Sequence, residues 1–364
     1  MKATFFVLDE LDFLQNRIFS GESINGVKNY GFLFTDLRTI LTAYGIDLAT
    51  QDIHPSEESD LIIALDQTVA LQQIRRKPTA KVYLLLNEPD TYYPENWAKE
   101  NHAIFDRVFT YDYTLADEQK YIHHYFAIDL DGTPAFQPVS EAEFNERQLC
   151  VLMAGMFQPT KPTGDSTSLL YERYQTVKWF ARHHPQEFSL YSRGINPRLL
   201  QSFRGLGVLQ RVLPAPIVEK VKNSVVERRQ TIFKAVSRGP VGPNDKIKTF
   251  RNYRFAICYE NTKLAGYISE KIFDCFGAGC VPIYLGEPEI ERFIPKECFI
   301  DRRNFQSYEE LYQFIKTMPY AQYQRYMQAI ADFSKGMEQE KFGSEANAQR
   351  IANVMVQDLQ LVAR

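Results

Sequence analysis

Short apolar runs separated by polar or helical segments define the first half of the chain. Runs with the length of buried strands occur at residues 4–8, 46–49, 61–64, 82–86 and 108–111. Residues 32–44 lie between the first two runs and predict a helix that ends near Gly45. Strands that alternate with helices are typical of a doubly wound α/β domain.

A polar stretch at residues 132–148 precedes a second series of the same kind. Apolar runs at residues 149–154, 188–191, 255–259 and 281–285 predict strands, and residues 169–183 predict a helix. From about residue 308 onward the apolar spacing is helical. We therefore expect two α/β domains with a cleft between them, at residues 1–145 and 146–330, and a helical tail at residues 331–364.

The segment at residues 255–286, FAICYENTKLAGYISEKIFDCFGAGCVPIYLG, has the length and order of a βαβ unit. Its polar residues gather in the loop and at the start of the helix. These residues are Glu260, Asn261, Tyr267, Glu270 and Lys271. Helical phasing places Tyr267, Glu270, Lys271 and Asp274 on one polar arc, away from the core-facing Ile272, Cys275 and Phe276. A crossover helix with a purely structural role does not need this concentration of polar groups.

A helix start with these residues predicts an anion site. Lysine is mildly unfavourable in a first helical turn unless an anion binds there together with the free backbone N–H groups. Gly266 would allow a phosphate to approach the backbone, and Glu270 could accept hydrogen bonds from ribose hydroxyls. A nucleotide diphosphate is the general expectation at the carboxyl end of a parallel strand. A solvated polar pair on the helix surface is the alternative, and spacing alone leaves the two interpretations about equal.

Composition limits the cellular setting and the partners. The net charge of −3 over 364 residues gives no electrostatic case for nucleic acid as a partner. Five cysteines without a CxxC pair fit a reducing compartment. The chain shows no signal-peptide pattern and no apolar stretch near the ~20 residues of a membrane span. We expect a soluble, cytoplasmic protein, for which peripheral membrane contact stays open.

The same segment resembles the signature of glycosyltransferase family ten, the α1,3/α1,4-fucosyltransferases. The matching parts are YEN at residues 259–261, YISEK at residues 267–271 and VPI at residues 281–283, with Tyr259 and Ser269 as mild departures. Tyr171-Glu172-Arg173 is similar to the family's phosphate-binding arginine segment. Glu88 lies in a turn, Asn87-Glu88-Pro89, that resembles the one carrying the family's proposed general base. The order Glu, Arg, YxxEK is also that of the family.

The resemblance implies a GT-B fold, in which two Rossmann-like domains face each other across a cleft. It implies inverting transfer of L-fucose from GDP-fucose to a glycan acceptor, without a metal. By position, Lys271 and Arg173 would neutralise the diphosphate, Glu270 would bind ribose, and Asn261 and Tyr267 would line the donor pocket. Without a Golgi-type anchor, a bacterial enzyme of surface polysaccharide or lipopolysaccharide synthesis is the expectation.

Glu88 would deprotonate the acceptor hydroxyl, although a Glu between a strand and a proline can equally cap a turn. Two other functions stay open. One is inverting transfer from a different nucleotide sugar, and the other is nucleotide-sugar binding without catalysis. Acceptor contacts are expected from loops near residues 23–30 and 92–97.

Other polar motifs have simpler interpretations. Asp129-Leu130-Asp131 matches a manganese motif of another glycosyltransferase fold, but it adjoins a Gly-Thr-Pro turn, where aspartate is common. The adjacent pairs His123-His124 and His183-His184 lack the i,i+4 spacing of a chelating pair, and exposed or capping histidines are expected. The basic residues from Lys220 to Lys234 are expected on a solvated helix flank, although Arg228 or Arg229 could approach the cleft, and Arg193, at a strand end, could reach the nucleotide.

Overall fold

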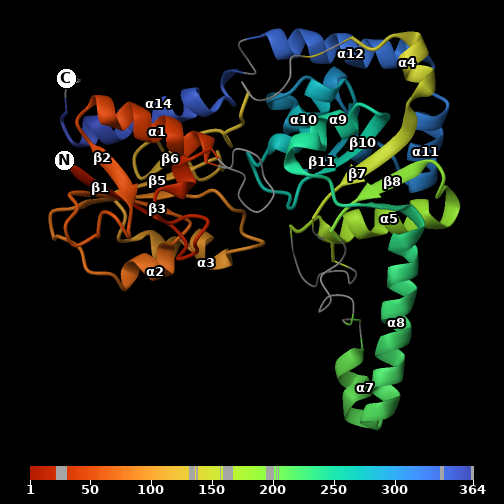
Figure 1. Ribbon diagram of the computed structural model, residues 1–364, viewed down its shortest axis with the longest axis horizontal. Helices are drawn as coiled ribbons and strands as arrows, with labels where there is room; N and C mark the ends of the chain where they lie inside the picture. The colour runs from red at the N-terminus through yellow and green to blue at the C-terminus, as the bar shows by residue number, and fades with distance from the viewer. Residues whose placement is uncertain are drawn as a thin grey trace.

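Two parallel sheets, one in each half of the chain, form the framework of the molecule (Figure 1). The computed structural model describes residues 1–21, 31–130, 136, 138–155, 157–158, 167–193, 201, 203, 205–336 and 340–361. Within these residues each sheet has six strands, and all paired strands run parallel. This is the expected GT-B class of α/β fold.

The first sheet has the strand order β2-β1-β3-β4-β5-β6. Its strands are β1 (Lys2–Phe6), β2 (Asp47–Thr50), β3 (Leu61–Leu65), β4 (Lys81–Leu85), β5 (Arg107–Thr110) and β6 (Tyr121–His123). Along β3, Leu61, Ile63 and Leu65 belong to one hydrophobic cluster, and Ile62 and Ala64 belong to a second. Both faces of the strand are therefore buried, which explains its continuous apolar sequence.

Helices cover both faces of this sheet (Figure 1). They are α1 (Phe32–Ala43), α2 (Thr68–Gln72), α3 (Pro94–Trp97) and, from the far end of the chain, α14 (Ser344–Asp358). The last of these lies beside α1, and its Ala348, Ile351 and Met355 join the core of the first sheet. The C-terminal segment thus returns to the N-terminal half of the molecule.

The second sheet has the order β12-β11-β10-β7-β8-β9. Its strands are β7 (Gln148–Met153), β8 (Phe188–Tyr191), β9 (Ser237–Gly239), β10 (Tyr253–Tyr259), β11 (Val281–Leu285) and β12 (Ile300–Asp301). Its helices are α4 (Glu141–Glu146), α5 (Leu170–His183), α7 (Leu206–Val212), α8 (Ala215–Val236), α9 (Lys246–Phe250), α10 (Glu270–Ala278), α11 (Tyr308–Lys316) and α12 (Tyr320–Lys335). In Figure 1, α8 extends away from this half and carries α7 at its tip.

The nine strands expected from the sequence agree with observed ones to within two residues at each end. The helices expected at residues 32–44 and 169–183 are α1 and α5. The domain limits expected after residues 145 and 330 stay predictions. Among the described helices, none combines the length and the apolar character needed to cross a bilayer.

Candidate active site

Ten residues of irregular chain connect β10 to α10 and carry most of the predicted polar residues. The helix begins at Glu270, with Ser269 as its N-cap. Ile272, Cys275 and Phe276 face the core as expected. Tyr267 precedes the helix, so its expected place on the helical polar arc is wrong. Its side chain is only 3% exposed.

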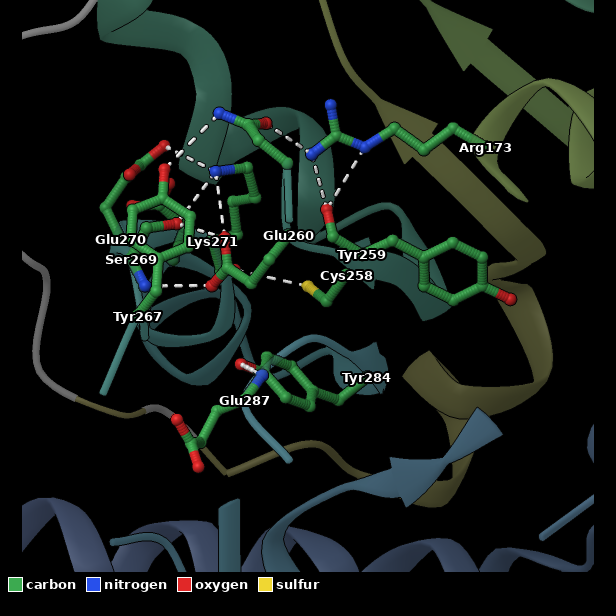
Figure 2. A network of polar contacts seen from close by, with 12 residues as sticks. Arg173, Cys258, Tyr259, Glu260, Tyr267, Ser269, Glu270, Lys271, Tyr284 and Glu287 are labelled. Carbon is green, nitrogen blue, oxygen red and sulfur yellow. Dashed lines mark hydrogen bonds and ion pairs between the residues drawn. The ribbon is translucent and has the colours of Figure 1, made fainter. Parts of the chain in front are cut away.

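Glu260 is the organising group of this segment, and its side chain is fully buried. One carboxylate oxygen accepts the backbone N–H of Ser269 at 2.8 Å, and the other accepts the Ser269 hydroxyl at 2.7 Å. Lys271 Nζ lies 3.1 Å from the same carboxylate and donates to Ser269 Oγ at 2.7 Å (Figure 2). The carboxylate therefore caps the helix start and holds Lys271 against it.

Glu270 lies between two lysines. Its Oε1 is 3.9 Å from Lys271 Nζ and 3.5 Å from Lys246 Nζ, and Lys246 also pairs with Asp274. Burial opposes ionisation of Glu270, but the two lysine charges outweigh it and hold its pKa at about 2. Glu270 is therefore an anion at neutral pH. Lys246, on the short helix α9, carries no motif signal, and sequence reasoning missed it.

Arg173 is 2% exposed, and its guanidinium donates to backbone and amide oxygens. It donates to the Tyr259 carbonyl at 2.5 and 3.2 Å and to Asn261 Oδ1 at 2.7 Å (Figure 2). Asn261 Nδ2 in turn donates to Tyr267 Oη at 3.3 Å. Burial lowers the pKa of the Arg173 guanidinium, which nevertheless keeps its charge at neutral pH.

Backbone pairing brings α5 to the loop after β10. The Leu169 N–H donates to the Asn261 carbonyl at 2.9 Å, and the Lys263 N–H donates to the Thr167 carbonyl at 2.9 Å. Thr262 Oγ1 donates to Thr167 Oγ1 at 2.8 Å. These contacts place Arg173, in the first turn of α5, beside Asn261 although the two are 88 residues apart.

Gly266 and Tyr267 join this loop to the first sheet. Gly266 has φ +74°, and a Cβ at this position would lie 1.8 Å from the carbonyl oxygen of Tyr111, just after β5. The Tyr267 ring contacts the rings of Tyr111 and Phe126 at centroid distances of 5.3 and 5.4 Å. The close approach at Gly266 is therefore made by the Tyr111 backbone, whereas the sequence suggests a phosphate there.

Replacing Gly266 by alanine is expected to lower the free energy of unfolding by about 2 kcal/mol or more, because strained φ and a backbone clash act together. Gly205→Ala is the matched control, since Gly205 has φ +89° and a Cβ added there would meet no atom within 4 Å. Thermal unfolding of both variants separates the clash from the backbone strain. Equal losses in the two variants would contradict a role for the Tyr111 contact.

Glu88 approaches the same region from the first sheet, two residues beyond the buried Leu86 that follows β4. Burial raises the pKa of its carboxyl, the nearby charge of Lys271 lowers it, and Glu270 raises it. These influences mean that Glu88 lies near the two helix-start residues of the other half. The fold thus brings Arg173, Asn261, Tyr267, Glu270 and Lys271 together, and Glu88 lies within electrostatic reach of Lys271 and Glu270.

Asp66, just after β3, was also missed by sequence reasoning. It is 6% exposed and accepts the backbone N–H groups of Asn87 and Glu88. Burial raises its pKa to about 8. Its position directly after an apolar strand is the signal that could have identified it, because adjacent parallel strands end at the same edge.

Among the described residues, the other histidine, arginine and aspartate residues singled out in the sequence are not seen to join this cluster. His124 is 3% exposed, so the expectation of exposed histidines is wrong there; burial lowers its pKa to about 4. Arg193 is exposed at the end of β8, and Arg229 contacts Tyr174 on α5. Asp131 and residues 23–30 lie outside the described residues. Within the described part of the chain, no three His, Cys, Asp or Glu side chains are grouped to hold a metal ion.

Comparison with known proteins finds a family match over part of the C-terminal half. Residues 225–352 match glycosyltransferase family 10 (fucosyltransferase), C-terminal region. An α-(1,3)-fucosyltransferase of Helicobacter pylori is 33% identical over 81 residues, 22% of this chain and 17% of that protein. Rat α-(1,3)-fucosyltransferase 7 is 36% identical over 95 residues, 25% of this chain and 26% of that protein. The chain thus matches about a quarter or less of the length of these relatives.

Solved structures resemble the whole fold at low sequence identity. An α1,3-fucosyltransferase crystallised with GDP-fucose aligns with a TM-score of 0.50 at 13% identity, over 98% of this chain and 90% of that chain. An α-glucosyltransferase in complex with UDP-glucose and DNA aligns with a TM-score of 0.52 at 10% identity, over 98% of this chain and 99% of that chain. At these identities the likeness establishes the two-sheet fold alone.

Proposed function

We infer that this chain transfers L-fucose from GDP-fucose to a hydroxyl group of a glycan. Residues 225–352, which match glycosyltransferase family 10 (fucosyltransferase), support this inference. One observation carries the proposal. Arg173, Glu270 and Lys271 lie around the carboxyl end of the second sheet, and Glu88, after β4 of the first sheet, is close enough for the charges of Lys271 and Glu270 to act on its carboxyl. Cations on one side and a carboxylate on the other match the needs of sugar transfer from a nucleotide diphosphate.

The donor half of the proposed site is the cluster around the start of α10. Lys271 and Arg173 would neutralise the diphosphate, and the first N–H groups of α10 would add the positive end of the helix dipole. Glu270, ionised at neutral pH, would accept hydrogen bonds from the ribose hydroxyls. Asn261 and Tyr267, which are hydrogen-bonded to each other, would line the pocket.

The reaction we propose is an inverting displacement. A glycan oxygen bonds to C1 of fucose while the bond from C1 to the β-phosphate oxygen breaks, and the electron pair of that bond leaves with GDP. Glu88 accepts the proton of the attacking hydroxyl. The raised pKa of Glu88 brings its basicity closer to that required at neutral pH, where a hydroxyl is a poor nucleophile. Fixed cations stabilise the charge that develops on the departing diphosphate.

The acceptor is proposed as a surface polysaccharide or lipopolysaccharide glycan, with an α1,3 or α1,4 linkage formed. Relatives described as α-(1,3)- and α-(1,4)-fucosyltransferases support the proposed linkages. The five buried free cysteines support a reducing compartment such as the cytoplasm.

A thermal-shift screen against GDP-fucose, GDP-mannose and UDP-sugars, followed by a glycan acceptor array, tests the function. Preferential stabilisation by GDP-fucose and transfer to at least one glycan are expected. Stabilisation by a UDP-sugar would favour another inverting transferase on the same fold. Binding of GDP-fucose without transfer to any acceptor or to water would favour a binding protein.

Turnover is expected to be unchanged by EDTA, because lysine, arginine and backbone N–H groups would supply the positive charge at the diphosphate. Initial rates with and without the chelator, in metal-free buffer, measure this. Addition of Mg²⁺ or Mn²⁺ serves as the control for trace metal. If EDTA abolishes activity and Mn²⁺ restores it, the proposal is contradicted, and Asp129 and Asp131 become candidate manganese ligands.

A further inference from the structure

Two backbone hydrogen bonds to a buried carboxyl hold the turn that carries Glu88. Asp66 Oδ1 accepts the Asn87 N–H at 2.9 Å, and Asp66 Oδ2 accepts the Glu88 N–H at 2.8 Å. The Asp66 N–H donates to the Leu85 carbonyl at 3.1 Å, which continues the pairing of β3 with β4. Each oxygen of one side chain therefore serves one of two consecutive peptide groups.

The other side of Glu88 is also fixed. Its carbonyl accepts a hydrogen bond from Trp97 Nε1 at 2.9 Å. Helix α3, which carries Trp97, is tied to the Asp66 segment, because Thr68 Oγ1 donates to Asn96 Oδ1 at 2.9 Å. The Glu88 backbone is thus held at its N–H by one segment and at its carbonyl by another, and the two segments are bonded to each other.

Turn formation alone does not account for the residue type at position 66. A buried carboxyl costs free energy, and among the described residues Asp66 forms no ion pair that would offset it. Asparagine or serine can stabilise a turn with a single acceptor oxygen. A carboxyl on a short side chain offers two acceptors side by side, which fits the two adjacent N–H groups at Asn87 and Glu88.

We propose that Asp66 is a positioning residue that fixes the Glu88 carboxyl at the distance and angle needed to accept the proton of the acceptor hydroxyl. The inference rests on the proposed role of Glu88 as general base. Asp66 acts through the backbone of the turn and does not contact the substrates. Its loss therefore lowers turnover without weakening donor binding, because the donor residues belong to the other sheet.

The test compares Asp66→Asn, Glu88→Gln and the double variant. Asp66→Asn presents an amide NH2 to one of the two N–H groups and removes one bond. We expect kcat to fall roughly 10- to 100-fold, as for a misplaced catalytic group, while the KM for GDP-fucose and the Kd for GDP stay within about twofold. In the Glu88→Gln background the same change is expected to have no further effect on kcat, because there is no base left to position.

Asp106→Asn is the matched control. Asp106 Oδ2 also accepts a backbone N–H of the first sheet, that of Val82 at 2.8 Å. Val82 lies near the start of β4, whereas Glu88 follows its carboxyl end. The kcat of Asp106→Asn is expected to match wild type once the protein is shown to be folded. If Asp66→Asn does not fold, Asp66→Gly, which suits the left-handed backbone at this position (φ +53°) and removes both acceptor oxygens, gives the same comparison.

The outcomes distinguish the role of Asp66 from the role of Glu88 and from the proposed function. Full kcat in Asp66→Asn together with an inactive Glu88→Gln variant would overturn the inference and leave the proposed function intact. Equal fractional losses from Asp66→Asn with and without Glu88 would also overturn it, because the effect would then be general to the fold. Wild-type turnover in Glu88→Gln would instead overturn the role of the base on which the inference rests.

Discussion

Replacing Glu88 by glutamine is expected to reduce kcat for fucosyl transfer by roughly 10²- to 10⁴-fold, the contribution typical of a general base. The amide keeps the size and hydrogen-bonding shape of the carboxyl but cannot take up a proton at neutral pH. The affinity for GDP-fucose is expected to change little, because the donor residues lie on the second sheet. Steady-state kinetics and calorimetric titration with GDP-fucose measure the two quantities separately.

The pH profile adds an independent readout. Burial raises the pKa of Glu88, so the carboxylate required for proton transfer is lost as the pH falls through a value above the usual 4.5. The acidic limb of the wild-type kcat/KM profile is expected to reflect this raised pKa and to disappear from the residual activity of Glu88→Gln. Glu57→Gln, a change at an exposed residue before β3, is the control. Unchanged turnover in Glu88→Gln would exclude Glu88 as the base.

The central strands of both sheets could be predicted because they are buried on both faces. A strand such as β10 is apolar at nearly every position, and its sequence alone carries the signal. The three unpredicted strands, β6, β9 and β12, have two or three residues each and lie at sheet edges. A strand of two or three residues at a sheet edge pairs with a single neighbour and needs no apolar run, so a sequence pattern does not reveal it, whereas the longer edge strand β2 is predicted.

The positions of the site residues follow from their motif, but their partners do not. The motif marks Glu260 as polar, yet its complete burial and its bonds to Ser269 and Lys271 depend on the loop folding back over the carboxyl end of β10. At Gly266 the sequence suggests the close approach of a phosphate, but the structure places the Tyr111 carbonyl there. Tyr111 follows a strand of the other sheet. The pattern of polar and apolar residues within one segment does not reveal a contact with a distant segment.

The spacing of apolar residues also does not predict which distant segment a helix packs against. The spacing of apolar residues predicts a helical tail with Ile351 and Met355 on its apolar face. Those positions are buried in the core of the first sheet, where α14 packs against α1, more than 300 residues earlier in the chain. Helical spacing gives the apolar face of such a helix but not the surface that covers it.

Replacing Lys271 by alanine is expected to weaken GDP binding roughly 10- to 100-fold, because the diphosphate would lose a charge-assisted partner worth about 1.5–3 kcal/mol. The same change leaves the Glu260 carboxylate buried without its cation. Removing one member of a buried ion pair costs on the order of 3 kcal/mol, so the variant is also expected to be less stable. A loss of binding in this variant alone would therefore have two explanations.

The double variant Lys271→Ala/Glu260→Gln separates them. A neutral amide at position 260 no longer needs a cation and can still accept the Ser269 N–H, so much of the stability should return. The deficit in GDP affinity should persist, because the lysine is still absent. Thermal unfolding and calorimetric titration with GDP provide the two readouts. If GDP affinity recovers together with stability, Lys271 acts through the Glu260 pair and does not bind the diphosphate, and a direct contact would be excluded.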